Sequence, residues 1–236
     1  MQEVRDHRVP AGPLAVRWLA YGAPPAQAGT LAPWRVELEN AGTAAWRELK
    51  LAYHWLDGLG NAIVWDGLRT DLPHLEPGAR LELAARVRAP IPPGGYRLAF
   101  DLVVEQRFWL SEVGNEPLDL SVDVLPRDAA GAVAHLPPDV EPAPDWVERA
   151  RAAHEQGYAA VGGSIEARRV PELTPYSPGG GRNSAFGAPL VCPSLLPPLE
   201  PNDHVVGLPA WRPEGDEPWL YDGRIRARLR SGRRRG

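Results

Sequence analysis

The sequence contains very little cysteine and very little lysine. Cys192 is the only cysteine among 236 residues, which excludes an intrachain disulfide and any metal site made of several cysteines. Lys50 is the only lysine, and the formal net charge is −4. A chain with this balance has no general electrostatic attraction for nucleic acids, so we expect no specific nucleic-acid binding. The folded part must be stabilised by packing, without a covalent cross-link.

Long apolar segments are missing as well. No stretch approaches the ~18 uninterrupted apolar residues of a membrane-spanning helix, and residues 1–12 lack the apolar core of a secretory signal. We therefore expect a cytoplasmic protein, with the inner surface of the membrane as an alternative location.

Motifs of known catalytic and metal sites are also absent. The six histidines are scattered, and none belongs to an HExxH pair or lies near a Gly-x-Ser-x-Gly turn. Asp57, Asp66 and Asp71 lie in neighbouring turns, but their spacing matches no calcium-binding loop and aspartate is itself a turn former. The sequence predicts no cofactor, no metal site and no catalytic residue. A small transferase with an unrecognised site in residues 145–236 is an alternative.

The residues that are abundant indicate strands and turns. Proline and glycine number 27 and 24, which is typical of a chain with many turns and little long helix. Residues 34–39, Trp-Arg-Val-Glu-Leu-Glu, alternate apolar and charged side chains, as a strand with one buried face does. The same alternation recurs in residues 49–55, 81–88, 96–105 and 118–124.

Turn residues separate these segments, and residues 14–21 and 62–65 add a first strand and a short one. About seven short strands without a helical pattern between them predict an all-β fold, an immunoglobulin-like antiparallel β-sandwich. We expect a short helix and a largely irregular, proline- and glycine-rich C-terminal region after it. The predicted boundaries are an N-terminal extension at 1–13, the sandwich at 14–126, a proline-rich linker at 127–144, the helix and irregular region at 145–223, and an arginine-rich tail at 224–236.

Two C-terminal segments have a second interpretation. Tyr158–Val161 is compatible with a strand, and Arg224–Arg230 alternates arginine with apolar residues, as an edge strand does. The seven arginines of Arg224–Arg235 have no acidic neighbour in sequence. As a solvated tail they would be available to an anionic surface.

Nine tryptophans are many for this length. Trp34 and Trp55 occupy the apolar phase of their predicted strands, so we expect them in the core. Trp46, Trp65 and Trp109 fall at strand ends or in loops. There the core and an exposed platform for a sugar or peptide are equally good interpretations.

The order of several motifs resembles the four-tryptophan (FW) immunoglobulin-like domain. The matching stretches are residues 34–42 followed by Trp46, residues 75–78, residues 89–96, and residues 101–105 leading into 108–110. Residues 53–55 (YHW) and 66–70 (DGLRT) are similar to a bacterial variant found with surface-polysaccharide glycosyltransferases. The resemblance implies an accessory module that binds a glycan or a protein. The candidate ligand-binding residues are Trp46, Trp65, Trp109, Asp66 and Arg69.

The leading functional prediction is therefore a non-catalytic binding module of a bacterial surface-polysaccharide system. The alternative is a protein–protein adaptor that docks through its proline-rich C-terminal half. The sequence does not indicate an oligomeric state.

Overall fold

The computed structural model describes residues 1–5, 7–135, 140–165, 173–176, 205–207 and 217–229. They form two compact units. The first comprises residues 1–26, 31–90 and 94–125, and the second comprises residues 126–236 with the short segments 27–30 and 91–93.

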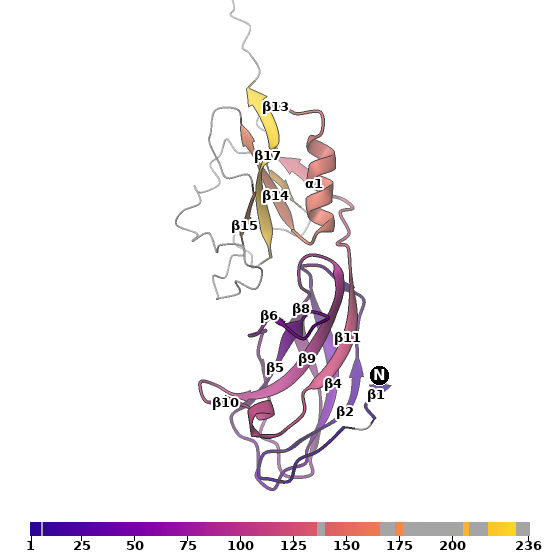
Figure 1. Cartoon of the computed structure of the whole chain (residues 1–236), viewed down its shortest axis with the longest axis vertical. Helices are drawn as coiled ribbons and strands as arrows, with labels where there is room; N and C mark the ends of the chain where they lie inside the picture. The colour runs from indigo at the N-terminus through magenta and orange to yellow at the C-terminus, as the bar shows by residue number, and fades with distance from the viewer. Residues whose placement is uncertain (6, 136–139, 166–172, 177–204, 208–216, 230–236) are drawn as a thin grey trace, which may run out of the picture. The chain divides into compact units, whose positions relative to one another are not determined.

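The first unit consists of two sheets packed face to face (Figure 1). Sheet one has the order β1-β2-β4-β8, and sheet two has the order β3-β11-β9-β5-β6, with β10 paired to β9 and β7 paired to β5. The pairings β1–β2, β2–β4, β4–β8, β11–β9, β9–β5, β5–β6, β10–β9 and β5–β7 are antiparallel. The strands of sheet one are β1 (Gln2–Glu3), β2 (Val16–Gly22), β4 (Leu31–Asn40) and β8 (Arg80–Arg88). Those of sheet two are β3 (Ala26–Gln27), β5 (Leu49–Leu56), β6 (Ala62–Val64), β7 (Thr70–Asp71), β9 (Gly94–Val104), β10 (Phe108–Trp109) and β11 (Leu118–Leu125), with the 3-10 helix η1 (Leu110–Val113) after β10.

The alternating side chains meet between the two sheets, which confirms the predicted all-β sandwich. Every predicted strand is present, and residues such as Val36 and Leu98 are fully buried. The largest fully buried side chains include four indoles and a phenyl ring, namely Trp18, Trp34, Trp46, Trp55 and Phe100. Large aromatic side chains remove much apolar surface from water, so they stabilise a sandwich that has no disulfide.

Polar groups of β5 also connect the two sheets. The Tyr53 hydroxyl accepts a hydrogen bond from the Arg88 backbone N–H at 3.0 Å, and the Trp55 indole N–H donates to the Arg88 carbonyl at 2.8 Å. Arg88 is the last residue of β8 in the opposite sheet. These bonds set the position of the two sheets relative to each other at one end of the core, where packing alone is less directional.

Asn40 joins segments of the sandwich that are distant in sequence. Its buried side-chain amide donates to the carbonyls of Ala44 and Leu75, both at 2.9 Å, and its oxygen accepts from the Gly42 N–H at 3.1 Å. Trp46 pairs with Leu75 in an isolated bridge beside it. One asparagine therefore joins the turn after β4 to the segment that precedes β8.

The described part of the second unit is a sheet with helix α1 packed against it. The strand order of this sheet is β12-β16-β14-β17-β13, with β15 also paired to β17; β14 and β17 are parallel, and the other described pairings of this sheet are antiparallel. Helix α1 lies beside β14 and β17 (Figure 1). The elements are β12 (Val133–His135), β13 (Val140–Pro142), α1 (Trp146–Glu155), β14 (Ala160–Ile165), β15 (Leu173–Tyr176), β16 (Val205–Gly207) and β17 (Trp219–Leu229).

The predicted helix is confirmed, and its apolar residues form a small core of their own. Trp146, Ala150 and Ala153 share one face of α1 because they are spaced by four and three residues. They pack with Val161 of β14 and Leu220 of β17. The buried Arg127 guanidinium pairs with Glu217 at 2.8 Å and donates to the Gly157 carbonyl at 3.2 Å within the same unit.

The structure differs from the sequence-based boundaries after residue 126. Strands β12 and β13 lie within the expected linker, and β14, β15 and β16 lie within the expected irregular region. Strand β17 includes residues 224–229 and lies between β14 and β13, so it is an interior strand rather than a tail or an edge strand. These strands pair with partners far away in sequence, which local patterns do not reveal. Cys192 and residues 230–236 lie outside the described residues.

None of the helices in the described part of the chain is both long and apolar enough to span a membrane.

We predict that replacing Asn40 with alanine lowers the free energy of unfolding by about 3 kcal/mol, because it removes the three hydrogen bonds of a fully buried side-chain amide, to the Ala44 and Leu75 carbonyls and from the Gly42 N–H. Urea titration measures the change. The matched control is Asn61→Ala, which removes an exposed amide bonded to Asp57 and should cost within about 1 kcal/mol. Equal losses for the two variants would contradict the structural role of Asn40.

Candidate functional site

The candidate site lies on the outer face of sheet two. Successive side chains of a strand point to opposite faces, so Lys50, Ala52 and His54 point away from the core that contains Leu51, Tyr53 and Trp55. The sequence pattern predicts that this outer face is wet. The structure shows instead that Ala52 and His54 are buried, and His54 is only 4% exposed.

Two loops account for the burial of this face. Residues 65–69 connect β6 to β7, and residues 105–113 include β10 and η1. Both contribute aromatic side chains that contact His54. The small side chains of Ala52 on β5 and Ala99 on β9 form part of the same buried layer. The prediction of a wet face is wrong at these positions because loops far away in sequence fold over it.

Three rings form the centre of the site. The His54 imidazole stacks on the Trp65 indole with 4.3 Å between ring centroids and 29° between planes. Trp109 packs against His54 at 4.4 Å and against Trp65 at 6.3 Å, in tilted and edge-on arrangements. His54 Nδ1 is also within hydrogen-bonding reach of the Trp65 carbonyl oxygen, and donates to it in the tautomer that carries the Nδ1 proton. Trp65 is nevertheless 57% exposed.

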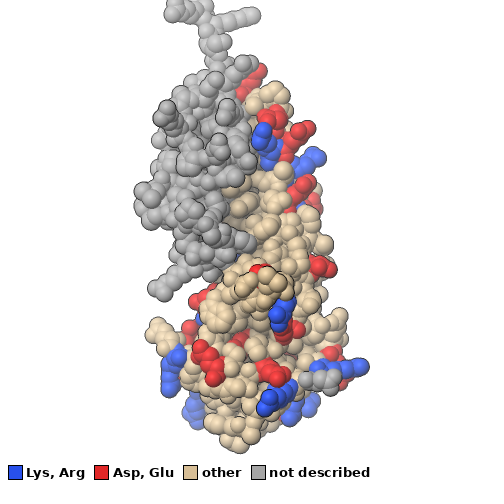
Figure 2. Space-filling view, in the orientation of Figure 1, with Lys and Arg blue, Asp and Glu red and all other residues tan. Residues whose placement is uncertain are grey.

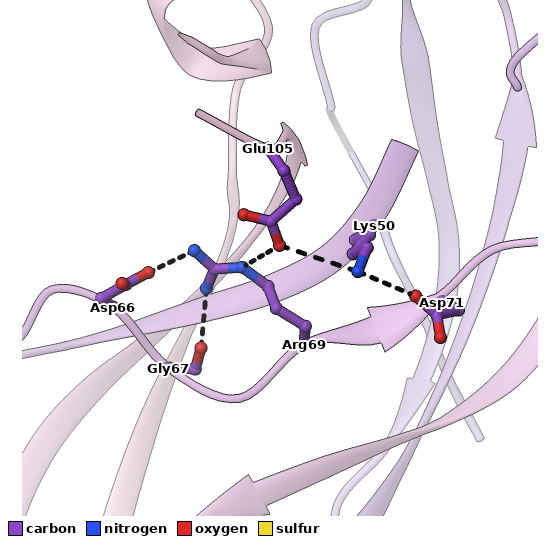
Figure 3. A network of polar contacts seen from close by, with 6 residues as sticks. All are labelled: Lys50, Asp66, Gly67, Arg69, Asp71 and Glu105. Carbon is purple, nitrogen blue, oxygen red and sulfur yellow. Dashed lines mark hydrogen bonds and ion pairs between the residues drawn. The ribbon is translucent and has the colours of Figure 1, made fainter. Parts of the chain in front are cut away.

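Arg69 holds the two loops together (Figure 3). Its guanidinium carbon lies 4.8 Å from the centroid of the Trp109 ring, a cation–π distance. Its Nε donates to Glu105 at 3.0 Å, its Nη1 donates to the Gly67 carbonyl at 2.7 Å, and its Nη2 donates to Asp66. One side chain therefore contacts both loops that cover the sheet.

The ionic network continues from Glu105 to Lys50 (Figure 3). The Lys50 ammonium lies 3.2 Å from Asp71 Oδ1 and 4.0 Å from Glu105 Oε1. Lys50 and Asp71 face each other across the β5–β7 pairing. The network thus comprises two cations and three carboxylates around the rings.

A buried carboxylate anchors the loop that contains Trp109. Asp101 lies on the outer face of β9 and accepts hydrogen bonds from the backbone N–H groups of Leu102, at 2.7 Å, and Ser111, at 3.3 Å. Burial raises the pKa of the Asp101 carboxyl above its usual range. Since Ser111 belongs to η1, this carboxyl holds the helix that follows Trp109 against the sheet.

Gly67 is required where the first loop passes the edge of β5. A Cβ atom at this position would lie 2.5 Å from the Tyr53 carbonyl oxygen and 2.6 Å from its ring. The Gly67 N–H donates to the same carbonyl at 3.0 Å. A residue with a side chain would push the loop, and Trp65 with it, away from the sheet.

The structure brings together four of the five candidate residues from the sequence, namely Trp65, Asp66, Arg69 and Trp109. The fifth, Trp46, lies elsewhere: it is 1% exposed and belongs to the sandwich core. His54, Lys50 and Glu105 also belong to the cluster, although they were not among the candidates predicted from the sequence. The sequence did indicate that Lys50 and His54 lie on the same side of the sheet, because residues separated by an even number of positions share a face of a strand.

The three aspartates considered as cation ligands each have a local partner. Asp57 accepts hydrogen bonds from the backbone and side chain of Asn61, Asp66 pairs with Arg69, and Asp71 pairs with Lys50. Within the described residues, no group of three or more histidine, cysteine or acidic side chains is arranged to hold a metal ion.

Comparison with known proteins identifies no family. No protein-family model matches the sequence, and no curated protein matches it. Solved structures similar to part of the chain include the C-terminal domain of wzt, with 11% identity over 52% of this chain and 80% of that chain and a TM-score of 0.37. Another is the ApaA protein of Bordetella pertussis, with 19% identity over 50% of this chain and 100% of that chain and a TM-score of 0.25. Similarity at this level supports no argument about function.

We predict that the free energy of unfolding falls as the pH falls below about 6.5, the pKa of an unfolded histidine. Burial is the main cause that lowers the pKa of His54 in the folded protein, so the unfolded chain binds the proton more readily. The stabilising contribution of neutral His54 is fully present above pH ~6.5. It is lost progressively as the pH falls from there to the lowered pKa that His54 has in the folded protein. Urea titrations between pH ~7.5 and ~5 measure this slope.

A His54→Phe variant provides the comparison for this slope. Phenylalanine keeps a ring between the tryptophans but does not titrate, so the variant should lose less stability over the same pH range. His154 in the second unit, whose pKa is also lowered mainly by burial, contributes equally to both proteins. An identical slope in the two proteins would show that His54 does not contribute.

Proposed function

We propose that this chain is a non-catalytic binding module whose ligand is a glycan, held by the exposed face of Trp65 on the outer side of sheet two. The observation that carries this proposal is the 57% exposure of an indole whose ring is stacked on a buried histidine. A large aromatic ring normally lies in the core. Here the surrounding structure supports the ring in an exposed position.

The cluster divides into a contact surface and its support. Trp65 has one face against the His54 ring, and its exposure leaves the opposite face available for a ligand. Trp109 is half-buried, and it contacts the His54 ring and the Arg69 guanidinium. Trp109, His54 and Arg69 therefore position Trp65, and we assign direct ligand contact to Trp65 and to the carboxylates around it.

The chemistry of the cluster suits a sugar. A pyranose ring has an apolar face of C–H groups that stacks on an indole, and hydroxyl groups at its rim that hydrogen-bond to charged side chains. Asp66 follows Trp65 directly in the chain, and Asp71 and Glu105 belong to the same network. A flat aromatic surface beside exposed carboxylates provides both kinds of contact.

The motif order of the sandwich supports a wider role. The stretches that resemble the FW immunoglobulin-like domain include Asp66–Thr70, which forms most of the loop beside Trp65. We propose on this basis that the module belongs to the bacterial variant of that family and acts as an accessory part of a surface-polysaccharide system.

A partner protein is the second candidate for the same surface. Leu68, in the loop that contains Trp65, is 38% exposed, so the loop presents two apolar side chains. Contiguous apolar side chains are typical of protein-binding surfaces. A glycan ligand uses Trp65 and the carboxylates, whereas a protein ligand would use Trp65 and Leu68.

We predict that Trp65→Ala weakens glycan binding at least about tenfold, because the stacking surface is the centre of the contact. Isothermal titration of the full chain with oligosaccharides of glucose, mannose, galactose and N-acetylglucosamine measures the affinities. Leu125→Ala, which truncates an exposed apolar residue at the end of β11, is the matched control and should bind as the wild type does. Leu68→Ala should also leave glycan binding unchanged.

Two outcomes would contradict this proposal. Absence of binding to every oligosaccharide of the panel would exclude a glycan ligand of these classes. Equal weakening by Trp65→Ala and Leu125→Ala would place the sugar elsewhere on the chain.

A further inference from the structure

We infer that the Trp65 surface selects uncharged, hydroxyl-rich glycans and rejects glycans that carry carboxylate, phosphate or sulfate groups. The inference rests on the proposed function and specifies its ligand class. It comes from the charged side chains of the network. Arg69 and Lys50 are paired with carboxylates of the protein, whereas each of the three carboxylates keeps one oxygen that makes no hydrogen bond in the network.

Arg69 has little capacity left for an anion. Three of its five N–H groups donate to Glu105, the Gly67 carbonyl and Asp66, and its guanidinium carbon lies over the Trp109 ring. Bidentate recognition of an anionic group by arginine uses two parallel N–H donors on the fork of the guanidinium. Every nitrogen of Arg69 already donates one N–H within the protein, and its charge is compensated by Asp66 and Glu105.

Lys50 is engaged in the same way. Its ammonium lies between Asp71 at 3.2 Å and Glu105 at 4.0 Å. Its charge is therefore compensated by two carboxylates before any ligand arrives. An anionic ligand would have to displace one of them, and the displaced carboxylate would stay close to it.

The carboxylates, in contrast, retain acceptor oxygens. Asp66 and Asp71 each use Oδ1 in the network, and Glu105 uses Oε1. Within the described residues, their second oxygens make no hydrogen bond in this network. The Asp66 and Asp71 side chains are 63% and 85% exposed, so these oxygens are available to donors from a ligand.

A neutral sugar provides the donors that these oxygens require. Hydroxyl groups donate to carboxylates in short, charge-assisted hydrogen bonds. A uronate or a phosphorylated sugar would bring a negative charge close to three carboxylates and two neutralised cations, and like charges placed together across an interface lower affinity. Figure 2 shows acidic and basic side chains of the sandwich interspersed on the face that it draws.

The test compares glycans that share a backbone and differ in charge. Titration of the full chain with carboxyl-reduced polygalacturonate against polygalacturonate, and with β-1,4-mannan against polymannuronate, should give at least about tenfold tighter binding to the neutral member. Affinity for the neutral member should change less than about twofold between about 50 and about 500 mM NaCl, because no net charge is paired on binding.

An acidic variant tests the role of the free oxygens. Asp71→Asn removes one charge and replaces an acceptor oxygen with a donor, so affinity for the neutral member should fall about three- to tenfold. Glu82→Gln is the control, because it alters an exposed ion pair with Arg35 on sheet one at 3.7 Å, and it should bind as the wild type does. Unchanged affinity in Asp71→Asn would overturn the assignment of its carboxylate.

The outcomes separate this inference from the proposed function. Tighter binding of the anionic members, weakened by salt and by Trp65→Ala, would overturn the neutral-glycan inference and support the proposed glycan site. Binding of neither member of any pair would overturn the proposed function, and the inference with it.

Discussion

Strand β5 is buried on both of its faces, and the character of the candidate site depends on this. Tyr53 and Trp55 fill the interior between the sheets, while Ala52 and His54 are covered on the opposite side. A strand in a two-layer sandwich ordinarily has one solvated face. Here the loops after β6 and β9 act as a partial third layer, and their aromatic side chains close over the histidine.

The covering loops are held by polar contacts as well as by stacking. Arg69 donates hydrogen bonds to both loops, and Asp101 of β9 accepts a hydrogen bond from η1. Desolvation of a carboxylate is costly unless hydrogen bonds compensate it, and Asp101 has two from the backbone. Both cations of the network, Lys50 and Arg69, are paired with carboxylates of the protein. The surface around Trp65 therefore combines an exposed aromatic ring with acceptor oxygens, which is the combination that the proposed function requires.

The two units are stabilised by different contacts. The sandwich has a core of large aromatic side chains and directional bonds between its sheets, such as the pair that Tyr53 and Trp55 make with Arg88. In the described part of the second unit, one face of α1 packs on β14 and β17. Its buried arginine is compensated by Glu217 and a backbone carbonyl. Neither unit uses a covalent cross-link.

The sequence by itself determined seven strands of the sandwich, the helix and the two tryptophans of the strand interiors, whereas the short strands β1, β3, β7 and β10 were not predicted. The predicted features depend on residues that are close together in the chain, where periods of two and of about four residues are directly visible. It also placed Trp65 and Trp109 among the candidates through their position at strand ends or in loops, and Asp66 and Arg69 through the family resemblance. Only the tertiary structure decided that Trp46 is buried while Trp65 is exposed. It likewise decided that His54 lies under two loops and that β14 pairs with β17, because each outcome depends on contacts between segments that are distant in sequence.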